Sequence, residues 1–337
     1  MRYVHLDKVK AGERLANDII APDGRLILRQ NVQLTDRLID GLKRMNIGGV
    51  YVADVRFKHL KMNEGLGSRF RTQAVGKLKT AFEEIYRTGD FTSRPVLDIT
   101  QQVVEEVNTK PNFAMQLQDV RSQDESILSH SISVCMLAVL TAKGMRYNMD
   151  QMKIVAIGAL LHDIGYASPQ LKNPYKEHAK QGFDLIRTHQ ELPLLSAHIA
   201  LQHHERLDGS GFPYGMKGEE VREYAQVCAI ANDFDNFINE PGTNRLPHEG
   251  IEFVMSRVGS CYSIAVVRAF VNQVAPYPVG TVVKLSNGMV GAVSETYQVN
   301  LSRPKILLSD RDGSVSLMEQ HTVFVEEVVT SWDLIPS

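Results

Sequence analysis

The sequence predicts a mainly α-helical protein, built as a helical bundle between a small α+β module and a small β-rich appendix. Apolar residues recur at helical spacing through most of residues 68–275. Short segments with strand character and turn signals occur on both sides of that region. A chain of 337 residues is long enough for two or three domains, one of them with a large core.

These patterns divide the chain into four expected parts. A basic, glycine-containing segment without clear periodicity separates the first module from the helices, and prolines mark the end of the bundle. The expected parts are an α+β module at 1–56, a linker at 57–67, a helical domain at 68–275 and a β-rich extension at 276–337.

The composition is that of an ordinary globular protein, with 43% hydrophobic and 23% charged residues. The net charge of -2 gives no reason to expect binding to a nucleic acid polymer. Three cysteines (Cys135, Cys228 and Cys261) are too few and too scattered for a disulfide framework or a cysteine-based zinc site. No signal segment and no membrane-spanning run is evident, so we expect a cytoplasmic protein.

The N-terminal module carries signals for strands and for one helix. Asp23-Gly24 can turn the chain between two short strands, and Thr35 can cap a helix. The expected elements are strands at 17–21, 25–29 and 50–52 and a helix at 36–45. No residue here suggests chemistry, so packing or homodimerisation is the simplest role for this module, and sensing is the alternative.

Apolar periodicity predicts the bundle helices, and Gly165 and Pro169 mark the end of one of them. His130 lies at the edge of an apolar stripe, where a histidine taken alone is usually structural. The expected helices are 68–88, 94–109, 111–120, 125–143, 151–162, 179–189, 192–205, 219–240, 248–258 and 261–275.

The β-rich extension shows two hairpin patterns. An Asn287-Gly288 turn separates the first pair of strands, and Asp312-Gly313 separates the second. The expected strands are 281–285, 289–293, 305–308 and 314–318. A lid or a docking surface is the simplest interpretation of such an appendix.

Groups that can bind metals gather between Leu160 and Gly215, which holds six of the eleven histidines. An apolar helix runs directly into His162-Asp163, and another ends in His203-His204-Glu205. A carboxylate beside an imidazole in an apolar setting is costly unless it is paired or metal-bound. Each pair alone is usually structural, but their combination with the glycine-rich loop that follows is rare. His189 and His198 match no further pattern, and we expect both to be structural.

This residue inventory favours a two-metal site. Adjacent histidines at a helix end can reach two neighbouring metals, and an Asp beside a His can bridge them through its two oxygens. Nitrogen and oxygen ligands without thiolates suit iron, manganese, nickel or cobalt, with zinc as an alternative. Two metals about 3.5–4 Å apart can share a hydroxide and hold a phosphoryl group, which is the chemistry of phosphoester hydrolysis.

The loop carries a resemblance to a known family. It reads His203-His204-Glu205-Arg206-Leu207-Asp208-Gly209-Ser210-Gly211-Phe212-Pro213-Tyr214-Gly215. This resembles the loop that gives the HD-GYP phosphohydrolases their name, and the similarity covers roughly residues 120–275. It implies an HD-type helical bundle with two, sometimes three, metals, often iron. The implied activity is hydrolysis of cyclic di-GMP to pGpG and onward to GMP in bacterial signalling.

The resemblance also assigns residues to roles. It implies two divalent ions, with iron or manganese favoured, and makes His162 and Asp163 catalytic. The implied metal ligands are His130, His162, Asp163, His178, His203, His204 and Asn232. The substrate-binding set is taken from the loop, as Arg206, Asp208, Gly209, Gly211, Phe212 and Pro213. Arg206 could meet a phosphate or pair with a carboxylate. Gly209, Gly211 and Gly215 are expected to allow positive backbone dihedrals and close approach, and Pro213 to stiffen the turn. Asp208 is also expected to hold the loop by accepting backbone N–H bonds.

The sequence departs from the family pattern at four places. Asn232 stands where the family has a ligand aspartate, and Asp233 could replace it only through a register shift. Tyr166 replaces a lysine near the substrate phosphate, and Phe212 replaces the tyrosine of the family name. A glutamate of three-metal members is displaced to Glu125, which favours two metals.

These departures leave two other hypotheses open. One is a module that binds a cyclic dinucleotide or a signalling protein and turns over poorly. The other is hydrolysis of a different nucleotide, as other HD-domain enzymes perform.

Overall fold

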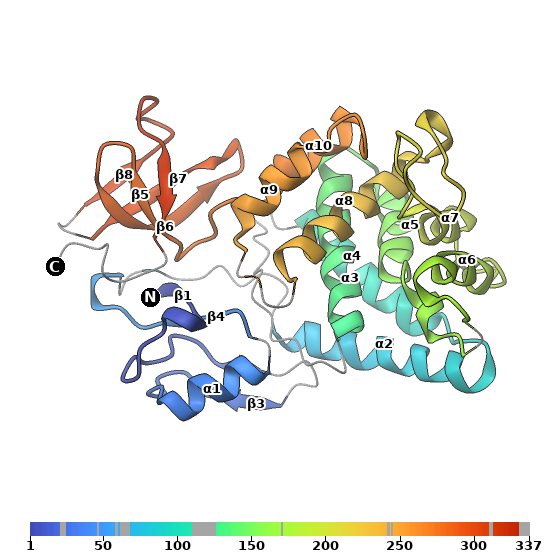
Figure 1. The fold of residues 1–337 in the computed structure, drawn as a ribbon, viewed down its shortest axis with the longest axis horizontal. Coiled ribbons are helices and arrows are strands. Elements are labelled where there is room, and N and C mark those ends of the chain that lie inside the picture. Colours follow the sequence, from blue (N-terminus) through green and yellow to red (C-terminus); the bar gives the residue numbers. More distant parts are fainter. Residues whose placement is uncertain are drawn as a thin grey trace.

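The computed structural model describes residues 1–20, 25–45, 47–57, 60, 68–109, 126–169, 171–240, 243, 245–309 and 313–329. Helices form one side of the molecule, and two small β-containing regions form the other (Figure 1). The predicted fold class, a mainly α-helical protein with small β-containing ends, is confirmed.

The bundle contains every long helix of the described chain. Its members pack around one apolar core. They are α2 (Ser68–Thr88), α3 (Arg94–Thr109), α4 (Ser126–Gly144), α5 (Met149–Leu160), α6 (Pro174–Ile186), α7 (Leu194–Gln202), α8 (Glu223–Ile238), α9 (Pro247–Met255) and α10 (Ile264–Val271).

The central helix is α4, which packs against α2, α3, α5, α8 and α10. Its segment Ile127–Gly144 is long and apolar enough to cross a membrane by length and composition, and 83% of that segment is buried inside the bundle. A helix that is apolar all round is what burial on every side requires. The apolar composition of α4 is therefore accounted for by its place in the core.

Most predicted helices are present, but several of their ends differ from the sequence prediction by a few residues. Helix α6 begins at Pro174 rather than near Ala179, because proline fits the first helical turn. Helix α7 ends at Gln202, and α8 begins at Glu223, later than predicted. The predicted helix at 111–120 lies outside the described residues.

The N-terminal module contains one helix and four short strands. Thr35 caps α1 as predicted, because its hydroxyl accepts the Leu38 N–H at 3.3 Å. The strand β1 was not predicted, and it pairs antiparallel with β4. The elements are β1 (Arg2–His5), β2 (Ile19–Ile20), β3 (Leu26–Leu28), α1 (Asp36–Arg44) and β4 (Gly49–Val52).

The C-terminal extension is a five-stranded antiparallel sheet with the order β8-β7-β6-β5-β9. Both predicted hairpins are present, as β5 with β6 and β7 with β8. The strand β9 was missed, and it closes the sheet against β5. The strands are β5 (Val282–Leu285), β6 (Val290–Tyr297), β7 (Asn300–Leu308), β8 (Ser314–Ser316) and β9 (Val325–Val328).

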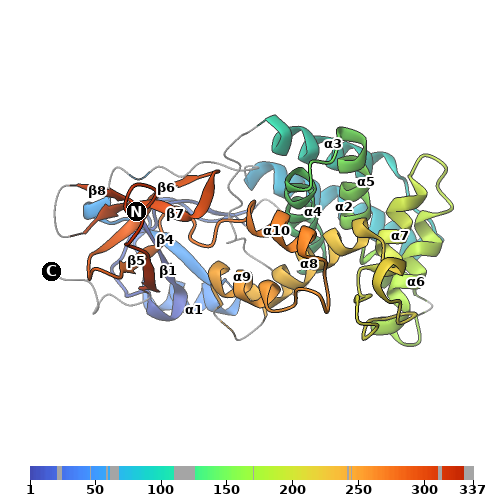
Figure 2. The same cartoon turned by 90° about the horizontal axis from the view of Figure 1, so that it is seen from above.

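The N-terminal module and the C-terminal sheet pack on each other (Figure 2). Phe57 and Leu60, the described residues of the predicted linker, are buried in a small core with residues of the sheet. A backbone hydrogen bond also joins the N-terminal module to the C-terminal extension, since the Tyr3 N–H donates to the Gly280 carbonyl at 3.0 Å. The N-terminal module and the C-terminal sheet therefore share one apolar interface.

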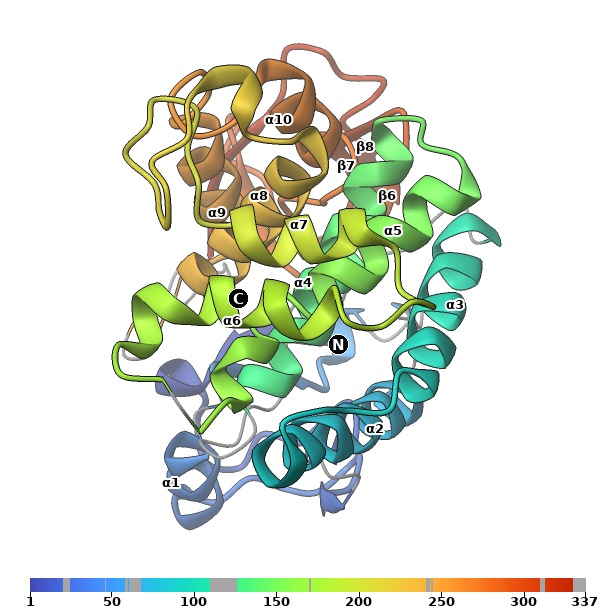
Figure 3. The same ribbon diagram turned by 90° about the vertical axis from the view of Figure 1, so that its right-hand side faces the viewer.

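Helices α6 and α7 lie side by side on the face of the bundle remote from the sheet (Figure 3). Helix α7 also packs against α5 and α8, which flank α4. The predicted ligand residues lie on these helices or directly after them.

Candidate metal centre

The His-Asp doublet lies directly after α5. The imidazole of His162 is fully buried, and its Nδ1 lies 2.8 Å from the carbonyl oxygen of Ala159, one turn back. A carbonyl only accepts hydrogen bonds, so Nδ1 carries a proton and Nε2 is the ring atom that faces Asp163. Asp163 follows where the chain turns into a short 3-10 helix, Ile164–Ala167.

His178 and His203 are oriented in the same way by their own helices. Nδ1 of His178 donates to the carbonyl of Pro174 at 2.9 Å, and Nδ1 of His203 donates to that of Ala200 at 2.8 Å. Both imidazoles are fully buried, and their Nε2 atoms point into the site. Hydrogen bonds of this kind fix the tautomer that a metal-binding histidine needs.

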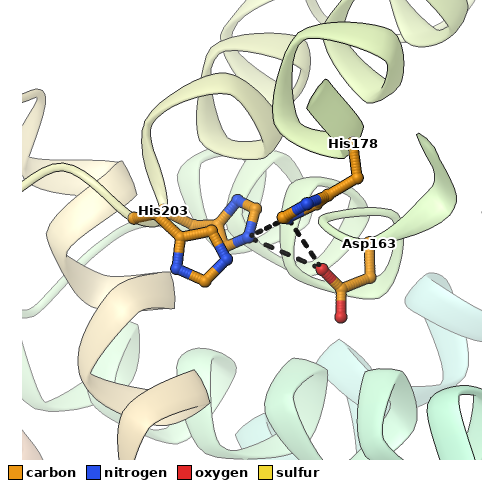
Figure 4. Close-up of side chains that lie close together, drawn as sticks. Asp163, His178 and His203 are labelled. Atoms are coloured by element: carbon orange, nitrogen blue, oxygen red, sulfur yellow. Dashed lines mark hydrogen bonds and ion pairs between the residues drawn. The ribbon is translucent and has the colours of Figure 1, made fainter. Parts of the chain in front are cut away.

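The first ligand group forms around one oxygen of Asp163. The Nε2 atoms of His178 and His203 are 3.3 Å apart, and Oδ1 of Asp163 lies 3.4 and 3.6 Å from them (Figure 4). A ring nitrogen of His204 completes the group, with all ligand atoms within 4.8 Å of one another. Three hydrogen-bond acceptors facing each other repel unless a proton or a cation lies between them.

The second ligand group forms around the other oxygen of Asp163. Its Oδ2 lies 3.3 Å from Nε2 of His162 and 3.9 Å from Nε2 of His130. Nε2 of His130 is also 2.9 Å from the amide oxygen of Asn232. The two groups share Asp163, so this carboxylate has the position of a bridge between two cation sites.

Two residues of α8 orient the second group from outside. Oδ2 of Asp235 accepts the Nδ1–H of His130 at 2.7 Å, which turns Nε2 of His130 toward Asp163. The Asn236 amide donates to Oδ1 of Asn232 at 2.9 Å, so the oxygen of Asn232 faces His130. Asn232 and Asp235 are both buried and lie one helical turn apart.

The charge states match a divalent cation site. Burial lowers the pKa of His203 to about 4, and burial also lowers the pKa of His204 strongly. Burial alone would raise the pKa of Asp163, but the neighbouring His162 holds it well below its usual range. At neutral pH, Asp163 is therefore ionised while His203 and His204 are neutral, which are the forms that bind metals.

The glycine-rich loop is held by Glu205, whose carboxylate is buried. Its two oxygens accept the N–H groups of Tyr214 at 2.7 Å and Met216 at 2.9 Å. Asp208 also holds the loop, as predicted, by accepting the Ser210 N–H at 2.9 Å. The loop is thus anchored beside the ligand histidines at both of its ends.

The predicted role of the loop glycines is partly corrected. Gly209 and Gly215 have positive φ values of 81° and 65°, as expected, whereas Gly211 does not. Gly211 is required for close approach, since a Cβ there would lie 2.4 Å from the His204 carbonyl oxygen. Pro213 follows Phe212 through a cis peptide bond.

Arg206 and Asp233 form a pair beside the site. The Arg206 guanidinium donates to both oxygens of Asp233, at 2.9 and 2.8 Å, and to the carbonyls of His203 and Glu205. The Tyr262 hydroxyl also contacts Asp233. Asp233 is thus engaged away from the histidines. Of the two neighbours Asn232 and Asp233, it is Asn232 that faces His130.

The structure brings the seven predicted ligand residues together, with the other six around Asp163. His189 lies outside, where it contacts Asp90 at 3.0 Å, and His198 packs against Phe183. Sequence reasoning missed Asp235, although its spacing from Asn232 placed both on one helix face. Glu125, the displaced counterpart of the glutamate found in three-metal members of the family, is outside the described residues.

Gly165 lets α6 approach the His-Asp turn. A Cβ at Gly165 would lie 2.0 Å from the His178 carbonyl oxygen. We expect Gly165→Ala to lower the free energy of unfolding by about 1–3 kcal/mol, because overpacking moves the backbone of α6. Thermal unfolding and metal content measure the effect.

Gly76→Ala is the matched control for this change. Gly76 lies on the exposed side of α2, and a Cβ there meets nothing within 4 Å. It should raise stability by up to about 1 kcal/mol, because alanine favours helix. Equal behaviour of the two variants would contradict the role given to Gly165.

Comparison with known proteins agrees with this geometry. Residues 127–237 match the family model described as HD domain. A cyclic di-GMP phosphodiesterase of Pseudomonas aeruginosa is 28% identical over 226 residues, which is 62% of this chain and 54% of that protein. A cyclic di-GMP phosphodiesterase of Thermotoga maritima is 35% identical over 132 residues, covering 34% of this chain and 36% of that protein. The chain thus spans about half the length, or less, of these relatives.

Among solved structures, an HDG"Y"P protein from Bdellovibrio bacteriovorus is similar with a TM-score of 0.48 and 15% identity. The match covers 80% of this chain and 97% of that one. At this level the likeness supports no statement about function.

Proposed function

We infer that this protein is a metal-dependent phosphodiesterase of the HD-GYP type that hydrolyses cyclic di-GMP, which the match of residues 127–237 to the HD domain model and the similarity to two cyclic di-GMP phosphodiesterases support. One observation carries the proposal. The two oxygens of Asp163 face two separate groups of imidazole nitrogens, His178 and His203 on one side and His130 and His162 on the other. Such an arrangement suits two divalent ions that act on one phosphodiester.

Each ligand group would hold one ion. His178, His203 and His204 would bind the first, and His130, His162 and Asn232 the second, with Asp163 shared. Iron and manganese fit this nitrogen and oxygen donor set. When bound, the ions supply charge stabilisation for the phosphoryl group and a water of lowered pKa.

The chain's own contribution is orientation and enclosure. Backbone carbonyls and Asp235 fix the ligand tautomers. The ring of Tyr166 stacks on His178, with centroids 4.2 Å apart, and that of Phe212 stacks on His204 at 4.3 Å. These rings shield the ligand imidazoles from water, which strengthens electrostatic interactions at the site.

The loop would receive the substrate, and the product would be pGpG, GMP or both. Arg206, Asp208, Gly209, Gly211, Phe212 and Pro213 remain the predicted contacts. The bidentate pair with Asp233 favours a positioning role for Arg206, through the backbone of His203 and Glu205. The protein would act in the bacterial cytoplasm.

A weakly active binding module is the second candidate. Compared with the family pattern, Tyr166 lacks the cation of a lysine, Phe212 lacks the hydroxyl of a tyrosine, and Asn232 lacks the charge of an aspartate. Losing a single oxyanion donor costs about 3–4 kcal/mol in known enzymes, so these changes can slow turnover without preventing binding. This module would bind the dinucleotide or a partner protein through the same loop.

Turnover measurements separate the two candidates. The protein is purified without oxygen, its metal content is measured, and cyclic di-GMP is followed by chromatography beside an Asp163→Ala control. We expect loss of cyclic di-GMP with appearance of pGpG or GMP in the wild type alone. Equal slow loss in both samples would favour the binding module, and faster loss of another cyclic dinucleotide would change the substrate.

A further inference from the structure

An exposed aromatic residue lies beside the metal centre without an evident role in the fold. Tyr175 is in the first turn of α6, three residues before His178, and 62% of its surface is exposed. A tyrosine that is so open to solvent adds little burial to the bundle. Its position is therefore better explained by a ligand than by packing.

Tyr175 extends a row of rings that begins at a ligand histidine. Phe212 stacks on His204, with centroids 4.3 Å apart and planes 21° apart. Tyr175 follows, with its centroid 5.0 Å from that of Phe212 and 6.1 Å from that of His204. The row leads from the buried centre to solvent, and its outermost member is its most exposed one.

A nucleotide has the shape to use this row. Its phosphate is separated from its base by a ribose, so a phosphate at the metals places the base beside the site rather than in it. Every base has a π-face that stacks on aromatic side chains, and this contact needs a ring but no hydroxyl. The tyrosine-to-phenylalanine change at position 212 would thus leave stacking intact.

We propose that Tyr175, supported by Phe212, is the stacking surface for a guanine base of the nucleotide whose phosphate lies at the Asp163 cluster. The inference rests on the proposed function, because it takes the phosphate position from it. It adds a binding residue from α6, outside the glycine-rich loop. Arg206 is paired with Asp233, so stacking offers an attractive contact that does not depend on that cation.

Binding to the metal-loaded protein tests this without turnover. Calorimetry compares GMP, which carries one base, with inorganic phosphate, which carries none. We expect Tyr175→Ala to weaken GMP binding about tenfold, in the range of base–aromatic stacking, and to leave phosphate binding unchanged. Tyr175→Phe should bind GMP as the wild type does, because it keeps the ring.

Tyr86→Ala is the matched control, since Tyr86 is 71% exposed on α2 and is not part of this row. It should change neither affinity. The proposal is overturned if the wild type does not bind GMP or if Tyr175→Ala binds GMP with wild-type affinity. It is also overturned if Tyr175→Ala weakens phosphate binding as much as GMP binding, or if Tyr175→Phe binds GMP as weakly as Tyr175→Ala does. Failure to hydrolyse any cyclic dinucleotide would instead contradict the proposed function, and GMP affinities would still report on stacking.

Discussion

Replacing Asp163 by asparagine is expected to remove both metals at once. Its Oδ1 lies within 3.6 Å of Nε2 of His178 and of His203, and its Oδ2 lies 3.3 Å from Nε2 of His162. Asp163 is the carboxylate common to both ligand groups of the described structure. An amide presents one oxygen and no charge, so neither site keeps its anionic ligand.

The expected size of this effect is large. Loss of a partner that only orients a ligand already costs about 10–100-fold in metal affinity, and loss of the shared ligand should cost more at each site. We expect fewer than about 0.2 metal ions per chain after dialysis, and turnover below about one thousandth of wild type. Inductively coupled plasma mass spectrometry and chromatography measure the two quantities.

Asp184→Asn provides the matched control for Asp163→Asn. Asp184 lies on α6, is partly exposed and pairs with Arg187 at 2.9 Å, so the same chemical change there leaves the cluster intact. Circular dichroism should show that both variants are folded. Retention of two metals by Asp163→Asn would contradict the shared-carboxylate interpretation.

Asn232→Asp is expected to act in the opposite direction, by strengthening the second site. Oδ1 of Asn232 already lies 2.9 Å from Nε2 of His130, in a position that a carboxylate oxygen can take without rearrangement. Two opposite unit charges about 4 Å apart attract by roughly 1–4 kcal/mol between water and a partly screened protein site. We therefore expect affinity for the second metal to rise by about fivefold to a thousandfold.

Competition with a chelator measures this change, with activity as a second readout. Asn148→Asp is the control, because Asn148 caps the remote start of α5 and aspartate caps helices equally well. It should not alter metal affinity. A second-site affinity of Asn232→Asp equal to that of wild type would show that this residue does not bind the ion.

The sequence predicted the helical bundle well because its core helices carry strong apolar periodicity. It also indicated the ligand residues, since His162-Asp163 and His203-His204 stand where apolar helices end. The prediction placed His178 at the start of its helix, but it lies one turn inside α6, because Pro174 begins that helix. Proline in a loop and proline in a first turn look alike in a sequence.

Contacts between distant segments were beyond the sequence. Asp235 orients His130 from 105 residues away, and its spacing from Asn232 indicates its helix face but not its partner. The strand β9 pairs with β5, and its exposed Glu326 and Glu327 give it no apolar alternation to detect. The row formed by His204, Phe212 and Tyr175 depends likewise on the crossing of α6 and the loop.

The shared apolar interface between the chain ends has a consequence for shortened forms of this protein. Phe57 is fully buried there, and Val282, Val290 and Ala292 of the sheet lie in the same small core. Truncating the chain after residue 275 would remove the sheet, expose Phe57 and leave an apolar patch on the surface. We expect fragments that retain both terminal regions, or neither, to stay in solution, and those that retain only one to aggregate.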